Sequence, residues 1–179
     1  MSAKTALKTL AALAAVGYLV LMIWTGARPT AELVTFEEKG VMAEDPAAVT
    51  LIEITAGDRH ATLERRAGGW AKAGRAAPLP APLAANVEKV VKYLHTANPV
   101  RELGAADLAG TDARELGFEP PRATIIVKGA QGTLLTTELG SRNTDGVLQY
   151  FRVAGRPQVY LVSGFVGEEW ERVLQGVLE

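Results

Sequence analysis

ATIIVKGAQGTLLTTELG, residues 123–140, is the stretch that decides the fold. Residues 123–127 are apolar and rich in β-branched side chains, which favours a strand, and the glycines at 129 and 132 are typical of a tight turn. Residues 133–139 form a second strand directly after that turn. Two strands joined by so short a turn pair in antiparallel order, so the stretch predicts a β-hairpin.

The same pattern continues toward the C-terminus. Residues 147–153 and 159–162 predict two further strands, joined by a turn that contains Gly155 and Pro157. Four short strands in succession indicate an antiparallel meander, with a polar loop at 140–146 between the second and the third strand. Ser163 is the predicted N-cap of a last helix. Its predicted buried stripe comprises Phe165, Val166, Trp170, Val173, Leu174 and Val177.

The preceding half of the chain predicts a second hairpin and one long helix. Residues 49–54 and 60–65 flank a Gly-Asp turn, and prolines at 78, 80 and 82 delay a helix until about residue 83. That helix has one apolar stripe, because its apolar residues recur at helical spacing: Leu83, Val87, Val90, Val91 and Leu94. Two short helical pieces are predicted at 105–108 and 112–116. Together these elements predict one α+β domain.

An apolar run at the N-terminus predicts a membrane anchor. Residues 9–27 carry no charge, and a helix over them would be about 28 Å long, close to the roughly 30 Å hydrocarbon core. Lys4 and Lys8 precede the run and only Arg28 directly follows it, which orients the N-terminus to the cytoplasm. The span would include Leu10, Leu13, Val16, Leu19, Leu21, Ile23 and, at the interface, Trp24.

Cleavage is the competing interpretation, because Thr25, Gly26 and Ala27 are small enough for a signal peptidase site. A signal peptide usually has a shorter apolar region, of about 7–15 residues, so length favours a retained anchor. The chain is therefore predicted to have a cytoplasmic tip and transmembrane anchor at 1–27, a juxtamembrane linker at 28–47 and a periplasmic α+β domain at 48–179. The apolar cluster at 33–36 fits two alternatives, part of a linker or a first edge strand.

Composition narrows the function classes. The chain has 19 basic and 20 acidic residues, so it lacks the excess of basic residues that nucleic-acid binding favours. It has no cysteine and two histidines, which excludes disulfides and thiol catalysis and argues against a histidine-based metal site. No cofactor is expected.

No catalytic residue is predicted. Ser141 and Ser163 lack a nucleophile frame, and the loop aspartates, Asp145 among them, are better explained as turn and cap residues. The predicted partner contacts are instead Arg142, Asn143 and Asp145 in the polar loop, with Trp70 after a double glycine. For Trp70, packing against the helix at 83–94 is the favoured alternative.

Several motifs occur in one order along the chain: RRAGGWAKAG at 65–74, VRELG at 100–104, ARELGFEPPRATIIV at 113–127 and YFRVAGRPQVYLV at 150–162. In this order the chain resembles the bacterial family catalogued as domain of unknown function 4340, from about residue 49 to the C-terminus. That family more often has leucine where Phe118 stands. The resemblance implies a membrane-tethered extracytoplasmic domain, often encoded beside transporter-type or gliding-type membrane machinery, and no known catalytic residues.

These patterns together predict a non-enzymatic, single-pass inner-membrane protein. Its periplasmic domain would serve as an accessory or scaffold subunit of an envelope or transporter-type membrane complex, and the N-terminal helix would contact the lipid bilayer. The alternative is a periplasmic ligand-binding protein or hydrolase that acts on an envelope lipid or glycan.

Overall fold

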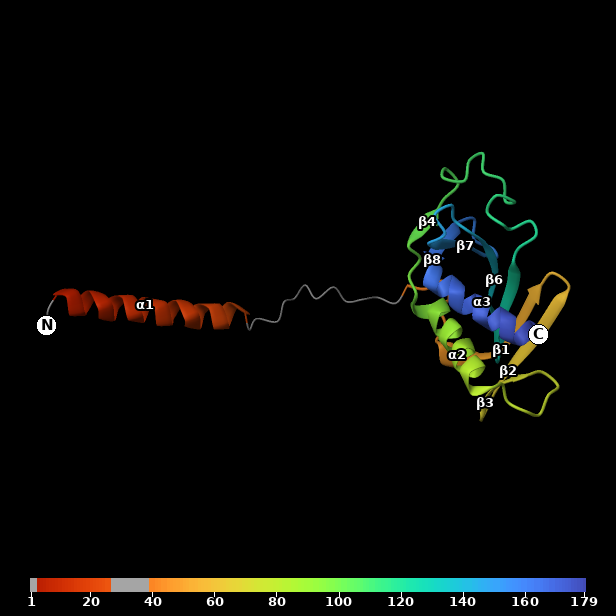
Figure 1. Cartoon of the computed structure of the whole chain (residues 1–179), viewed down its shortest axis with the longest axis horizontal. Coiled ribbons are helices and arrows are strands. Elements are labelled where there is room, and N and C mark those ends of the chain that lie inside the picture. Colours follow the sequence, from red (N-terminus) through yellow and green to blue (C-terminus); the bar gives the residue numbers. More distant parts are fainter. Residues whose placement is uncertain (1–2, 27–38) are drawn as a thin grey trace. The chain divides into compact units, whose positions relative to one another are not determined.

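The computed structural model describes residues 3–26 and 39–179, which belong to two separate compact units (Figure 1). The first unit contains helix α1 (Ala3–Gly26). Its described large apolar side chains, including Leu10, Leu13, Val16, Leu19, Leu21, Ile23 and Trp24, are exposed. Among the residues described, no helix is long and apolar enough to cross a membrane. The predicted linker or edge strand at 33–36 lies outside the described residues.

The second unit is built on an eight-stranded antiparallel sheet in the order β3-β2-β1-β5-β6-β7-β8-β4. The α+β class, both hairpins and the C-terminal meander are confirmed. The strands are β1 (Val49–Ala56), β2 (Arg59–Arg66), β3 (Gly69–Lys72), β4 (Arg101–Leu103), β5 (Ala123–Gly129), β6 (Gly132–Arg142), β7 (Leu148–Val153) and β8 (Val159–Ser163).

Helices α2 (Ala81–Thr96) and α3 (Gly164–Leu178) pack on one face of this sheet and on each other (Figure 1). Side chains alternate along each strand, so every second residue faces the helices, as Ala123, Ile125 and Val127 do in β5. The α2 stripe is confirmed, with Val87, Val90, Val91 and Leu94 buried. The largest side chains enclosed in this core are Trp70, Trp170 and Phe151.

Helix α3 begins where predicted, but one residue of its predicted stripe is exposed. The Ser163 hydroxyl accepts a hydrogen bond from the Val166 backbone N–H at 3.4 Å, which confirms the N-cap. The predicted stripe is buried except for Phe165, which is 55% exposed. Phe165 lies in the first turn, where its ring meets the Tyr93 ring of α2 with centroids 5.9 Å apart instead of facing the sheet.

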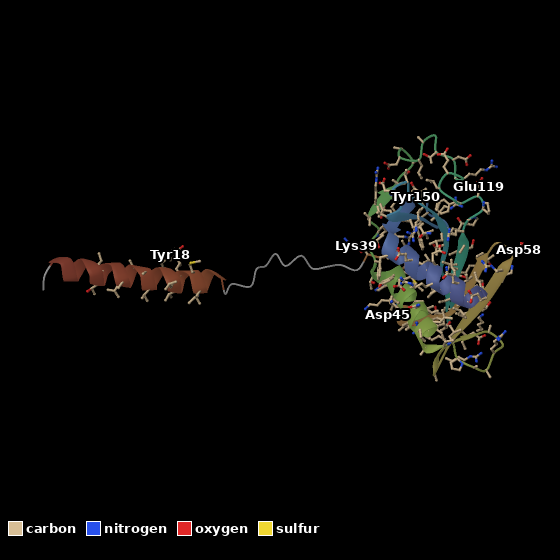
Figure 2. The ribbon with its side chains drawn as sticks, viewed as in Figure 1. Tyr18, Lys39, Asp45, Asp58, Glu119 and Tyr150 are labelled. Carbon is tan, nitrogen blue, oxygen red and sulfur yellow. The ribbon has the colours of Figure 1, made fainter. Side chains whose placement is uncertain are left out.

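The folded unit begins earlier than the predicted residue 48, at Lys39 among the described residues (Figure 2). The Gly40 and Met42 N–H groups donate to the carbonyls of His95 and Leu94, each at 2.8 Å. A Cβ at position 40 would lie 2.3 Å from the Leu94 oxygen, so this approach requires glycine. Val41 and Met42 are buried, which corrects the linker prediction for 39–47: two apolar residues are too short a pattern to indicate docking.

The opposite face of β7 and β8 is partly covered by the connection from β4 to β5. Leu116, Phe118 and Val159 form a second small core there. The helical pieces predicted at 105–108 and 112–116 are turns instead, and each is followed by a glycine with a positive φ angle, 82° at Gly110 and 75° at Gly117.

Replacing Leu94 with alanine is expected to lower the free energy of unfolding of residues 39–179 by about 2–5 kcal/mol, because the side chain is buried and leaves a cavity. Chemical denaturation monitored by circular dichroism measures the loss. Lys92→Ala, at an exposed position of the same helix, is the matched control and should change stability little. Equal midpoints for Leu94→Ala and wild type would contradict the burial of this stripe.

Candidate functional site

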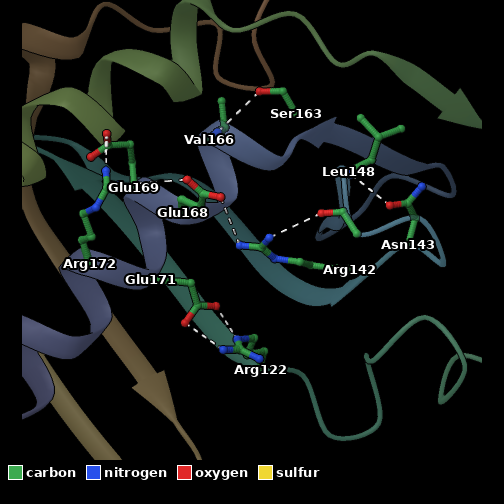
Figure 3. A network of polar contacts seen from close by, with 11 residues as sticks. Arg122, Arg142, Asn143, Leu148, Ser163, Val166, Glu168, Glu169, Glu171 and Arg172 are labelled. Atoms are coloured by element: carbon green, nitrogen blue, oxygen red, sulfur yellow. Dashed lines mark hydrogen bonds and ion pairs between the residues drawn. The ribbon is translucent and has the colours of Figure 1, made fainter.

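The predicted contact loop lies between β6 and β7, and Arg142 at its start is tied to α3 (Figure 3). β6 extends through Arg142, so it includes the first three residues of the stretch predicted as loop at 140–146. One Arg142 amino group donates to the Gly146 carbonyl at 3.4 Å, and the other lies 3.6 Å from a Glu168 carboxylate oxygen. Arg142 remains exposed, so it holds the loop against α3 and still presents its guanidinium to solvent.

Asn143 has a structural role in this loop. Its side-chain oxygen accepts a hydrogen bond from the Leu148 N–H at 2.9 Å, and its own N–H donates to the Leu148 carbonyl at 2.9 Å. The side-chain oxygen therefore holds the turn, and the role of Asn143 as a contact residue stays a prediction. Asp145 is exposed at the tip of the same loop, as a contact residue would be.

Trp70 is not an exposed recognition residue. It is 2% exposed, its indole N–H donates to a Glu88 carboxylate oxygen of α2 at 2.9 Å, and the Arg65 guanidinium lies 4.8 Å from its ring centroid. Strands β2, β1 and β5 separate β3 from β6, so the sheet does not bring Trp70 to the loop. The alternative, packing against the helix, is confirmed.

A network of charged side chains on α3 was not predicted from the sequence (Figure 3). Glu169 is 2% exposed, and one carboxylate oxygen accepts from Lys89 of α2 at 3.3 Å and from Arg172 at 2.7 Å. Glu171 forms a second ion pair with Arg122. One signal could have identified Glu169: it lies three residues after Val166 and four before Val173, on the buried side of the helix.

Glu169 is held as an anion. Burial by itself raises the pKa of this carboxyl, but hydrogen bonds and charges from Lys89 and Arg172 outweigh it and leave the pKa below its ordinary value. The three groups thereby join α2 to α3 through a fixed negative charge. At the loop after β4, the Gly104 N–H and then Arg101 likewise lower the pKa of Asp107.

Open depressions surround the C-terminal end of α3. One of about 320 Å³ is lined by Arg59, Arg122 and Glu171, and one of about 330 Å³ by His60, Lys72 and Arg75, among others. In the first, Arg122 and Glu171 are already paired with each other. Within residues 3–26 and 39–179, the acidic and histidine side chains form no group of three that could hold a metal ion.

Comparison of the chain with protein-family models, with curated proteins and with solved structures gives no match. The resemblance to the domain of unknown function 4340 family therefore stays a prediction that rests on the motifs alone.

Asn143→Ala is expected to lower the free energy of unfolding by about 1 kcal/mol, because it leaves the Leu148 N–H without its side-chain acceptor. Asp145→Ala, two residues away and exposed, should be neutral. Thermal unfolding of both variants measures the difference. If Asn143→Ala were as stable as Asp145→Ala, the side chain would not be holding the turn.

Glu169→Gln is expected to reduce the loss of folding stability that occurs as the pH falls. The folded-state pKa of Glu169 lies below the unfolded value of about 4.3, so its stabilisation is present above that value and is lost as the pH falls through the folded-state pKa. The melting temperature of the wild type should therefore fall more steeply below about pH 5 than that of the variant. Glu102→Gln, at an exposed position, is the control and should follow the wild type.

Proposed function

We propose that the chain is a non-enzymatic, single-pass inner-membrane protein, with its N-terminus in the cytoplasm and its α+β unit in the periplasm. That unit would act as an accessory or scaffold subunit of an envelope or transporter-type membrane complex. The observation that carries the proposal is the uncharged run at 9–27, preceded by Lys4 and Lys8 and followed by a separately folded unit.

Support for the anchor comes from the sequence. The uncharged run at 9–27 is long enough for a helix of about 28 Å, close to the roughly 30 Å hydrocarbon core of a bilayer. Its length, and not a structural contact, is what the proposal rests on.

Support for an accessory role comes from the surface of the folded unit. Three exposed apolar side chains, Val100, Val147 and Phe165, gather at one end of it, and exposed apolar patches mark sites of interaction with proteins or membranes. Arg142 and Asp145 remain exposed beside that end, in the β6–β7 loop. The family resemblance implies a partner of the transporter type.

The second candidate function is binding or hydrolysis of an envelope lipid or glycan. The depressions at the end of α3 favour it, because their volumes of about 320 and 330 Å³ are those of small ligand sites and cations line them. Complementation of a deletion strain by a Lys72→Ala, Arg75→Ala double variant separates the two functions. Loss of function with normal stability and normal partner recovery would favour the ligand-binding candidate.

The anchor predicts that the mature protein retains Lys4 and stays in the membrane pellet after a carbonate wash. Intact-mass measurement of the purified protein checks the first point, and a mass that corresponds to a chain starting at Arg28 would overturn the anchor. Purification of the full chain in mild detergent then tests the accessory role. A membrane complex that co-purifies with wild type and is reduced for the Arg142→Ala, Asp145→Ala variant is the expected result.

A further inference from the structure

Three large apolar side chains are exposed among residues 39–179, and all three lie at the same end of the sheet. Val100, Val147 and Phe165 are 60%, 62% and 55% exposed. The Gly164 N–H donates to the Val147 carbonyl at 2.7 Å, so Val147 lies beside the first turn of α3, which carries Phe165. The Val100 N–H donates to the Leu161 carbonyl at 2.8 Å, three residues before α3 begins.

These exposed side chains lie beside apolar side chains that are buried or half-buried. Side chains alternate along a strand, and Leu103 packs on the far face, so Val100 lies on the face that carries Val162 and the helices. A small apolar void of about 10 Å³ lies beneath the exposed side chains, and Tyr93, whose ring meets Phe165, lines it together with buried core residues. We call the exposed surface the apolar end; it comprises Val100, Val147 and Phe165, with the half-buried Tyr93 and Ala97 beside them.

The chain from α1 also reaches the folded unit at the apolar end. Lys39 donates its backbone N–H to the Asn98 side chain at 2.7 Å, and Gly40 bonds to His95, both at the C-terminal end of α2. The next residue, Val41, lines the small apolar void.

We infer that the apolar end contacts the lipid bilayer surface and so gives the folded unit a second attachment beside its tether. The inference rests on the proposed anchor. Aromatic and aliphatic side chains enter the boundary between headgroups and acyl chains, and a few of them bind only weakly. A tether raises the effective concentration of such a weak contact, which then suffices to orient the unit.

The proposed attraction between the apolar end and the bilayer is apolar and not electrostatic. Asp145 and Glu168 are exposed near the apolar end together with Lys92, so the charges around it are mixed. An anionic lipid should therefore add little to binding. A protein partner on the same surface is the competing occupant, and the experiment is designed to separate it from lipid.

The test uses residues 39–179, whose core lies entirely within that segment. This fragment is mixed with vesicles of phosphatidylcholine, and separately with vesicles of phosphatidylethanolamine and phosphatidylglycerol, and then sedimented. Phe165→Ser is expected to reduce the partition coefficient about tenfold, since burying the exposed part of a phenylalanine contributes roughly 1.4 kcal/mol. Ala130→Ser, in the β5–β6 turn at the opposite end of the sheet, is the control and should bind as wild type.

Phe165→Trp supplies a second measurement. Trp70 and Trp170 are buried, so a tryptophan at 165 reports on this surface, and its emission should shift to shorter wavelength with either vesicle. No binding of the wild-type fragment at about millimolar lipid, which is the effective concentration that a short tether provides, overturns the inference, and so does equal binding of Phe165→Ser. So does a photo-crosslinker at position 165 of the full chain that captures protein and no lipid in cells. The anchor is tested separately, since the full chain would remain in the carbonate pellet whether or not the apolar end binds lipid.

Discussion

The pairing of β1 with β5 is the interaction on which the rest of the folded unit depends. It joins the N-terminal hairpin to the C-terminal meander in one sheet, through pairs such as Ile52 with Val127 and Ile54 with Ile125. Only a continuous sheet offers an apolar face broad enough for α2 and α3 to cover together. Because the two strands are distant in the sequence, their pairing closes a long loop that contains β2, β3, α2 and β4.

Local patterns in the sequence predicted the local parts of this fold. The two hairpins, the α2 stripe and the Ser163 cap each depend on residues close together in the chain, and all are present. The β1–β5 pairing, the docking of Val41 and Met42 and the position of β4 beside β8 depend on distant segments. A short apolar pattern does not indicate which surface it will bury against, so these features could not be predicted.

In the candidate surface, too, the sequence predicted what depends on nearby residues and not what depends on distant segments. The polarity of the β6–β7 loop correctly indicated exposure for Arg142 and Asp145, whereas the use of Asn143 inside the turn depends on the register with Leu148. The apolar end was missed because its residues come from separate segments. Helical periodicity also assigned Phe165 to the core, although its ring is exposed at the start of α3 and packs on Tyr93 of α2. Periodicity gives the face of a helix but not how far along the helix its partner extends.

The docking of residues 40–42 on the end of α2 has a mechanical consequence. Any tension that arrives along the chain from its N-terminal side meets two backbone hydrogen bonds, Gly40 to His95 and Met42 to Leu94, before it reaches the sheet. Peeling this short segment uncovers Val41 and Met42 but leaves every strand pair intact. Residues 40–42 would therefore detach from α2 first under load, while the sheet and its helices would keep their shape.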